Sequence, residues 1–465
     1  MKRLLSLVVL TGALAPGVGA SAHVLDVSPG ALGSFLRSEK IESGSLVLRG
    51  TIDARDISAL GSAKLDTLDL SGITIAPYVA ARPLFFGARS FAADALPVGA
   101  FAGSQIRTVI LPVALRSIPD NAFTASSVTE VQLPEGILSI GESAFAQCPA
   151  LERINFPASL TQMGAYAFAG SSMLAKADLS ATGIAELPAH AFDGCTALNE
   201  LSLPRTVHHI GELAIAGTGV ENISATSSVE TAPFALAKAT ELQSSAVTLA
   251  EPNATGVYFG DSSLSSVASP SPVIADAIYA YCTALNTTDV LAEATQVGSY
   301  AFAGTGSWRI TFSETVTSLG DGVFADAIAL ESIDVRPLGV NIPSVTERTF
   351  DGLQQSEITL LVTPEYILDW ANAPGWRDFK VVGAKGIDDV TANDYSVAYS
   401  GGQVTVRSGE TLLRVTVYGT DGRILASAAP DACETSLKLD TPDNVLIVTS
   451  RTAGGKTYTD KLFIR

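Results

Sequence analysis

The sequence predicts a mainly β fold with short helical or irregular turns, in which a long solenoid precedes a small β-sandwich. Three observations lead to this prediction. A unit of 19 to 26 residues recurs from Phe101 to Phe350, short alternating strands recur inside the unit, and the repetition stops after Lys385. A unit this short cannot bury its own apolar face, so consecutive units must stack on one another.

Each unit is marked by an aromatic or large aliphatic residue, usually preceded by Ala. The chain carries this frame residue at Phe101, Phe123, Phe145, Phe168, Phe192, Ile215, Phe234, Phe259, Tyr279, Phe302, Phe324 and Phe350. A steady period over about 250 residues indicates one continuous array. We expect the frame residues to form a ladder of rings inside the stacked coils, with the units from Phe234 to Tyr279 following the pattern least closely.

A short strand is predicted in each unit. The segments IRTVILP, VTEVQLP, LERINFP and LNELSLP place apolar residues at their first, fourth and sixth positions, and a proline follows. Apolar residues that alternate with outward-facing ones are typical of a strand, and proline ends it. A second apolar pair such as Leu138 and Ile140 and then a glycine such as Gly141 follow. The stacked coils should therefore share a parallel sheet on one face.

Two columns of side chains point outward from this predicted sheet, on either side of the buried strand position. One column contains Thr108, Glu130, Arg153, Lys176, Glu200 and Asn222, and the other contains Ile110, Gln132, Asn155, Asp178, Ser202 and Ser224. These positions vary in charge and size while their buried neighbours repeat, which is typical of a solenoid binding face. Simple solvation predicts similar variation. The columns are the candidate partner-binding face.

The amino-terminal residues predict an export signal. Lys2 and Arg3 precede an apolar run from Leu4 to about Leu14, and Ala20-Ser21-Ala22 provides the small residues of a cleavage site. We assign residues 1–22 to a signal peptide. No later stretch has the roughly 18 apolar residues that a membrane span requires. The protein is therefore expected to be secreted or at the outer cell surface, after export through the periplasm.

The rest of the chain divides into three parts. Residues 23–100 are an amino-terminal cap with the first atypical repeats, and residues 101–385 are the repeat array. Residues 386–465 contain short alternating runs such as VTVYGTDGRIL and NVLIVTS, with TDG as a hairpin turn. Closely spaced short strands of this kind predict a small antiparallel β-sandwich.

The array resembles a known family. The pattern LPxxLxxIGxxAFxxCxxLxxIxLP is similar to the leucine-rich repeat of BspA-like bacterial surface proteins, over roughly residues 45 to 383. LRGTIDARDISAL with LDTLDLSGITI resembles the amino-terminal cap of such arrays. VTPEYILDWANAPGWRDFKVV resembles their last turn, in which Trp370, Trp376 and Phe379 would cover the end of the core. The likeness implies adhesion to a host or bacterial surface or matrix protein.

The carboxy-terminal segment resembles a sorting domain. VTVYGTDGRIL and the closing residues KLFIR are similar to the carboxy-terminal domain of type IX secretion substrates, although DNVLIV replaces the family's usual Gly-Xaa-Tyr-Ile-Val. The resemblance implies that the type IX secretion machinery reads this domain as an export address. The domain would be cleaved at the outer membrane and would not carry the binding activity.

Composition and cysteine positions narrow the chemistry. A net charge of −18 repels phosphate backbones, so a nucleic-acid partner is not expected. Cys148, Cys195 and Cys282 each follow a frame residue by three positions and therefore occupy one repeat position. Coils two apart lie at roughly 10 Å, beyond the reach of a disulfide. We expect small buried thiols rather than bridges or nucleophiles.

No catalytic, cofactor-binding or metal-binding residues are assigned. His208 and His209 are adjacent on an extended segment and would point to opposite faces, without a ligand at metal spacing nearby. Asp388 and Asp389 lie in a predicted linker, where paired acids are ordinarily solvated. Neither a phosphate-binding loop nor a dinucleotide fingerprint is present. The sequence therefore gives no support for an enzyme or a cofactor.

Two function classes remain open. The first is a binding protein, whose sheet face contacts a protein partner. The alternative is a glycan-binding module for nutrient capture, which would need aromatic platforms on the surface. The Phe residues are expected inside and Trp370 and Trp376 in the terminal cap, so Trp308, at a predicted outward strand position, is the exception.

Overall fold

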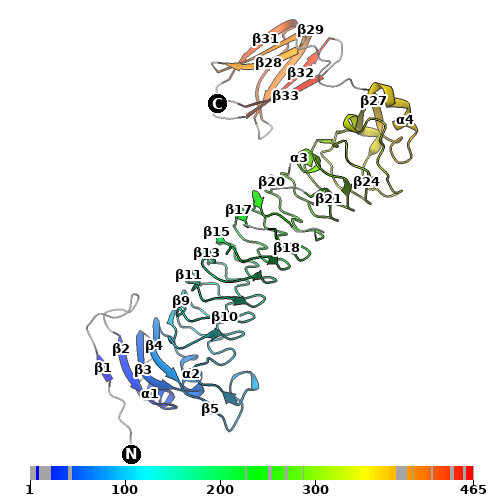
Figure 1. The fold of residues 1–465 in the computed structure, drawn as a ribbon. Helices are drawn as coiled ribbons and strands as arrows, with labels where there is room; N and C mark the ends of the chain where they lie inside the picture. Colours follow the sequence, from blue (N-terminus) through cyan, green and yellow to red (C-terminus); the bar gives the residue numbers. More distant parts are fainter. Residues whose placement is uncertain are drawn as a thin grey trace, which may run out of the picture. The chain divides into compact units, whose positions relative to one another are not determined.

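The computed structural model describes most of the chain. The described residues are 7–9, 22–39, 44–225, 228–249, 254–267, 271–285, 287–383, 395–400, 402–419, 423–439, 445–453 and 457–463. They form two compact units (Figure 1). The first consists of Met1–Val362 and Tyr366–Val382, and the second of Thr363–Glu365 and Gly383–Arg465. Asp388 and Asp389 lie outside the described residues.

The amino-terminal end of the first unit is a parallel sheet flanked by helices. Its elements are β1 (Leu7–Val9), β2 (His23–Val27), α1 (Leu32–Glu39), β3 (Ser45–Ile52), α2 (Ala54–Leu60), β4 (Thr67–Ile75), β5 (Tyr78–Val79), η1 (Phe85–Gly87) and β6 (Ser90–Phe91). Strands β2, β3 and β4 are parallel, and β1 pairs antiparallel with β2. Asp53 begins α2 with a capping box that includes Asp56. Strand β4 pairs with the first repeat strand, so this cap continues directly into the array.

The array has two strand-bearing faces. The sheet face, which carries the predicted outward columns, contains β7 (Thr108–Ile110), β9 (Glu130–Gln132), β11 (Arg153–Ile154), β13 (Lys176–Asp178), β15 (Glu200–Ser202), β17 (Asn222–Ser224), β19 (Ser244–Ala246), β20 (Ser266–Val267), β23 (Arg309–Thr311), β25 (Ser332–Asp334) and β26 (Thr359–Val362). The second face contains β8 (Ser117–Ile118), β10 (Ser139–Ile140), β12 (Gln162–Met163), β14 (Glu186–Leu187), β16 (His209–Ile210), β18 (Glu230–Thr231), β21 (Val273–Ile274), β22 (Gln296–Val297) and β24 (Ser318–Leu319). Pairing within both faces is parallel. The sequence predicted a parallel sheet on the first face only, so the second strand-bearing face is an addition by the structure.

The frame residues form the predicted inner ladder. Phe123, Phe145 and Phe168 are fully buried, and their ring centroids lie 5.1 and 5.2 Å apart with the planes nearly parallel. The backbone hydrogen bonds between coils repeat with the same period as the rings. Phe123 donates its N–H to the carbonyl of Ala144 and Phe145 donates to that of Ala167, both at 2.7 Å. The inside of each coil is therefore held by rings and amides together.

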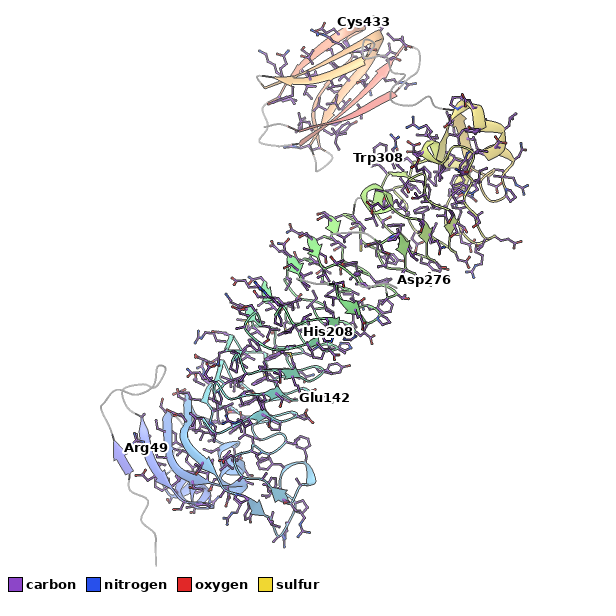
Figure 2. All side chains as sticks on the ribbon, viewed as in Figure 1. Arg49, Glu142, His208, Asp276, Trp308 and Cys433 are labelled. Atoms are coloured by element: carbon purple, nitrogen blue, oxygen red, sulfur yellow. The ribbon has the colours of Figure 1, made fainter. Side chains whose placement is uncertain are left out.

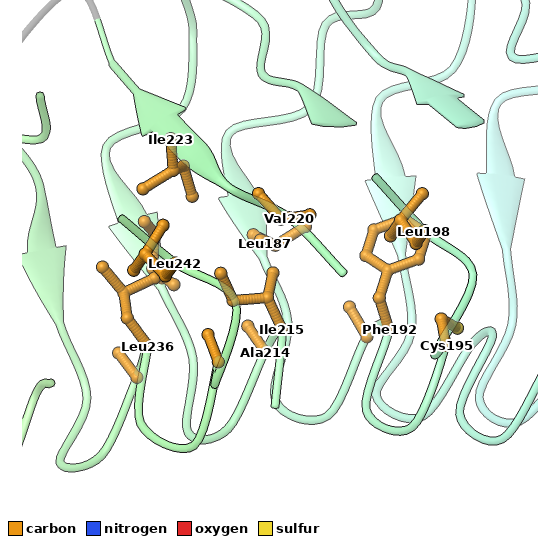
Figure 3. Packing of buried hydrophobic residues seen from close by; sticks show 14 of the residues in the cluster. Leu187, Phe192, Cys195, Leu198, Ala214, Ile215, Val220, Ile223, Leu236 and Leu242 are labelled. Carbon is orange, nitrogen blue, oxygen red and sulfur yellow. The ribbon is translucent and has the colours of Figure 1, made fainter. Parts of the chain in front are cut away.

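The ladder differs from the sequence prediction in two coils. Leu236 and Tyr258 occupy the inner position, fully or almost fully buried (Figure 3 shows Leu236). The predicted Phe234 and Phe259 are half-buried, and their rings meet edge to face with centroids 5.8 Å apart. Leu236 donates its N–H to Val257, as a frame residue does. The prediction was wrong here because it followed the aromatic ring, although Ala235 precedes Leu236 as Ala precedes most frame residues.

Turn geometry explains why a ring also occurs beside the frame. From Phe101 to Phe324, the residues two before and two after each inner residue have a left-handed backbone, as at Ser143 (φ 52°) and Gln147 (φ 53°) around Phe145. Phe234 (φ 58°) occupies the first of these positions and covers Gly256 of the next coil. Such side chains point outward over the neighbouring backbone rather than into the core. An aromatic residue at this site therefore does not mark the frame.

The three repeat cysteines are buried and unpaired, as predicted. Each thiol donates to the backbone carbonyl of the inner residue one coil earlier in the chain. Cys148 donates to Phe123 at 3.0 Å, Cys195 to Phe168 at 3.1 Å and Cys282 to Tyr258 at 2.9 Å. Ser171 makes the same contact with Phe145 at 2.6 Å. In these coils the position holds a small side chain that donates a hydrogen, whereas buried Ala239 and Ala327 occupy it in two other coils.

The far end of the array is closed as the sequence predicts. The elements not yet given are α3 (Thr287–Leu291), between β21 and β22, and, towards the end, η2 (Arg336–Leu338), η3 (Gln355–Glu357), η4 (Pro364–Tyr366), α4 (Ile367–Asn372) and β27 (Lys380–Gly383). Trp370 and Trp376 are fully buried, with centroids 5.1 Å apart. Trp376 packs at 4.9 Å on Phe350, the last frame residue, and Phe379 packs on the same ring. These aromatic side chains cover the final coil.

The second unit is an antiparallel β domain. Its strands are β28 (Tyr395–Ser400), β29 (Gln403–Tyr418), β30 (Ile424–Ala428), β31 (Ala432–Lys438), β32 (Val445–Thr452) and β33 (Thr457–Phe463). Strand β29 pairs along its first half with β28 and β31 and along its second half with β30 and β32. A separate core includes Val404, Val415 and Val448. The unit therefore has its own interior.

Candidate functional site

The sheet face carries nine of the ten predicted binding residues at its surface. Arg153, Lys176, Asp178, Glu200 and Ser202 are exposed, and Asn155 is exposed beside them. The half-buried members are Thr108, Glu130 and Gln132. Paired register places Lys176 opposite Glu200 and Asp178 opposite Ser202, so the two columns exist as predicted.

Ile110 is the member that leaves the surface. It is only 7% exposed, and its neighbours in the register are Asp69 on β4 and Gln132 on β9. Asp69 is itself 4% exposed. Covering the apolar side chain of Ile110 removes its surface from water, which is favourable, whereas the charged residues of the columns extend into water. We therefore remove Ile110 from the candidate face.

Ion pairs connect neighbouring strands along the first column. Arg153 contacts Glu130 at 2.8 Å, and Lys176 contacts Glu200 at 2.9 Å. The hydrogen bond from Arg153 lowers the pKa of Glu130, and the hydrogen bond to Glu200 raises the pKa of Lys176. Glu130 and Lys176 are therefore charged at neutral pH. Because Arg153, Lys176 and Glu200 are exposed to solvent, the two ion pairs contribute little to stability.

The second column contains two internal contacts. Asn155 accepts from the amide of Leu133 at 2.7 Å and donates to its carbonyl at 2.9 Å, so its amide joins neighbouring coils. Asp178 accepts from the Ser180 hydroxyl at 2.6 Å and from the Ser180 amide, and these bonds lower the pKa of Asp178. Asn155 thus has a structural role, while Asp178 presents a charge outward.

A cleft of about 700 Å³ lies between β11 and β13. In the part of the chain that the structure describes, β11 pairs only with β9, and β13 pairs only with β15. Six predicted column residues line the cleft, together with half-buried Ile154 and Phe156. These six are Glu130, Gln132, Arg153, Asn155, Lys176 and Asp178. The sheet is therefore open where its charged columns are densest.

Two local changes coincide with this opening. The inward position of β13 is Ala177, which is smaller than Ile154 at the same position of β11. The following turn is also one residue longer, because Ile184 follows Leu179 by five residues where Leu160 follows Phe156 by four. Ser180 and Ala181 of the longer turn line the cleft. The longer turn is the sequence feature that could have predicted the opening of the sheet here, and with it the partial exposure of Ile154 and Phe156 at the bottom of the cleft.

Comparison with protein families decides the class of this array. The BspA type leucine-rich repeat region matches in six copies, over residues 116–240 and 255–372, which is more than half of the chain. This chain belongs to the BspA-type leucine-rich repeat family. A comparison with curated proteins finds no match.

Solved structures similar to this BspA-type chain are distant. A leucine-rich repeat protein from Bacteroides ovatus has 16% identity and a TM-score of 0.35, covering 66% of this chain and 92% of its own. A leucine rich cell surface protein from Faecalibacterium prausnitzii has 17% identity and a TM-score of 0.41, with 70% and 90% covered. The pneumococcal vaccine antigen PcpA has 14% identity and a TM-score of 0.33, with 73% and 80% covered.

A second feature of the BspA-type sheet face lies near its far end. Trp308 is 52% exposed and immediately precedes β23 (Figure 2). Its neighbour Arg309 contacts buried Asp334 at 2.7 Å, and Arg336 contacts the same carboxylate at 2.6 Å. Burial raises the pKa of Asp334, but the hydrogen bonds from the two arginines outweigh it and lower the pKa overall. This ion triad is structural, whereas the Trp308 ring is available to a ligand.

Other reactive groups of the BspA-type array do not assemble into a site. Burial raises the pKa of Cys195 to about 12 and also raises that of Cys148, so these thiols stay protonated. His208 stands outward on the surface in Figure 2. Among the residues with described positions, no three His, Cys, Asp or Glu side chains are grouped to hold a metal. No helix within the described ranges is long and apolar enough to cross a bilayer.

Proposed function

We propose that this chain is a secreted or cell-surface binding protein that holds a protein partner on its sheet face, as in adhesion. The observation that carries the proposal is the cleft between β11 and β13, where an apolar floor meets exposed groups of both signs. Protein interfaces combine a partly apolar centre with a polar rim in this way. The three repeat cysteines are buried, and burial raises the pKa of Cys195 and of Cys148, so we propose no nucleophilic role for these thiols.

The sharpest test reverses the charge of the two cations in the first column of the sheet face. The full chain is immobilised and exposed to a panel of host matrix proteins and to bacterial surface proteins. Arg153→Glu with Lys176→Glu should weaken capture of an acidic partner by at least about tenfold, since like charges at an interface cost several kcal/mol. Capture that survives this variant unchanged would contradict a site on this face.

Two matched variants control the experiment. Glu130→Arg with Arg153→Glu exchanges the members of one ion pair, which keeps the net charge while reversing the pattern across β9 and β11. Arg205→Glu with Lys238→Glu makes the same change in total charge at exposed positions outside the sheet-face columns. The exchange should weaken capture, and the second control should leave it unchanged.

Glycan binding for nutrient capture is the second candidate, and exposed Trp308 favours it. Sugar rings pack on exposed aromatic faces, and Trp308 is the only tryptophan outside the terminal cap. The test is a glycan array probed with the full chain and with Trp308→Ala. A glycan retained by the wild type and lost by the variant would establish this function, whereas an array without hits would remove it.

We also propose that the second unit is a type IX sorting domain, whose only partner is the secretion machinery. Support comes from its separate core and from the compact division of the chain near residue 383. Deleting residues 386–465 should leave the array folded and its binding intact, because Trp370 and Trp376 already cover its end. Cell fractionation should find the truncated protein in the periplasm. A truncated chain that reaches the cell surface would disprove the assignment.

A further inference from the structure

The charges around the cleft have a symmetric order. Along the first column the residues read Glu130, Arg153, the cleft, Lys176 and Glu200, so both cations border the opening. Each is paired with a carboxylate on the strand away from the opening, at 2.8 and 2.9 Å. Arginine has five N–H donors and lysine three, so both keep donors beyond these contacts. No described carboxylate bridges the two cations across the cleft.

The floor between the columns is apolar. Ile154 and Phe156 are only partly buried, and the ring of Phe156 packs edge to face on Phe168 at 5.6 Å, which holds it in place. Val131 and Leu133 complete this floor beneath β9. A large apolar side chain placed here would remove exposed apolar surface from water without requiring the array to rearrange.

We propose that the cleft anchors an extended peptide segment of the protein partner by two adjacent groups. A carboxylate of the segment is held between Arg153 and Lys176, and a large apolar side chain beside it packs on Ile154 and Phe156. The inference rests on the proposed binding function and names the chemistry of the partner. Carboxylates accept charge-assisted hydrogen bonds from both kinds of cation, and a single buried apolar anchor gives most of the energy in many interfaces.

The surrounding charge selects a single carboxylate over a polyanion. Glu130, Glu152, Asp178 and Glu200 stand around the same two cations, and the chain as a whole has a net charge of −18. A sulfated polysaccharide or a nucleic acid would bring many negative charges against these carboxylates. A sulfated polysaccharide also carries no apolar side chain to pack on this floor. A peptide with one acid beside an apolar residue meets both conditions.

The test uses the full chain and a random peptide library displayed on phage. Enriched peptides should carry Asp or Glu within two positions of Leu, Ile, Phe or Trp. Arg153→Gln with Lys176→Gln removes the cations, and Ala181→Phe fills the cleft from an exposed position. Either change should weaken a synthetic copy of the best peptide by about tenfold or more, whereas Arg205→Gln with Lys238→Gln should have no effect.

The outcomes separate this inference from the function on which it rests. A library without enriched peptides, or peptides that bind all variants equally, would overturn the anchor. A sulfated glycan that binds the wild type and is lost with the cations would overturn the choice of a peptide. Matrix-protein capture that survives Ala181→Phe but is lost in Glu200→Lys with Ser202→Lys would keep the sheet-face function and reject the cleft. Failure of all matrix-protein capture, with peptides still bound in the cleft, would reject the adhesion partner alone.

Discussion

Replacing Phe145 with alanine tests the stacked core most directly. The ring is fully buried between Phe123 and Phe168, with both neighbours nearly parallel to it at 5.1 and 5.2 Å. Removing a buried Phe costs about 3–5 kcal/mol when the cavity cannot collapse. Two aromatic contacts of about 0.5–1.5 kcal/mol each are lost as part of that cost. Both flanking coils are held by backbone bonds to their neighbours, so we expect about 4–5 kcal/mol, near the upper end.

Two control variants should each cost less than Phe145→Ala. Phe145→Leu should cost only about 1–2 kcal/mol, since Ile215 and Leu236 show that the inner position accepts an aliphatic residue. Phe234→Ala removes a half-buried ring at a left-handed position where Ala277 occurs in another coil, and it should cost about 1 kcal/mol.

The assay is urea unfolding followed by far-ultraviolet circular dichroism, with hydrogen exchange to locate the loss. Exchange should accelerate most at the amides of Phe123 and Phe145, which donate into the next coils. The reasoning would be refuted if Phe145→Ala unfolded at the same urea concentration as the wild type, or if it lost no more stability than Phe234→Ala.

The remaining predictions concern buried titratable groups. In the folded protein a thiol reagent should modify exposed Cys433 quickly and the three repeat cysteines only after unfolding; an intramolecular bridge in the peptide map would contradict the register. Burial raises the pKa of Asp261 well above the usual value, and the second carboxylate oxygen has no hydrogen-bond partner. Because the folded pKa is the higher one, wild-type stability declines as pH rises above the ordinary Asp range. The melting temperature of Asp261→Asn should therefore increase relative to that of the wild type as pH rises from 4 to about 8. A difference in melting temperature that does not depend on pH would disprove this.

Much of the fold follows from the sequence because the same interior must recur in every coil. The positions of Phe145 and Cys148 could be predicted from spacing alone, since most coils place a large buried side chain at the inner position and a small one three residues later. Leu236 was missed because a left-handed turn position beside the frame also accepts a ring, and Tyr258 was missed because a second ring, Phe259, directly follows it. The rule that Ala precedes the frame residue would have chosen Leu236 over Phe234.

The candidate site was less predictable than the core. Outward positions of Arg153 and Lys176 follow from strand alternation, but their grouping at an opening does not. The opening depends on Ala177 and on one additional residue in the next turn, which are small departures within an otherwise regular pattern. Repetition makes the interior predictable, whereas departures from repetition produce the surface that distinguishes this chain.

Interruption of the ring ladder has a consequence for how the array unfolds. One run of stacked rings extends from Phe101 to Phe192 and a second from Tyr258 to Phe324, with only Ile215 and Leu236 between them (Figure 3). In a one-dimensional stack each coil is stabilised by its neighbours alone, so cooperativity passes along the array only as strongly as its weakest interface allows. The aliphatic pair makes the array two coupled blocks. Mechanical pulling on the ends should accordingly release one block before the other, with a pause between them, rather than unzip the array in a single event.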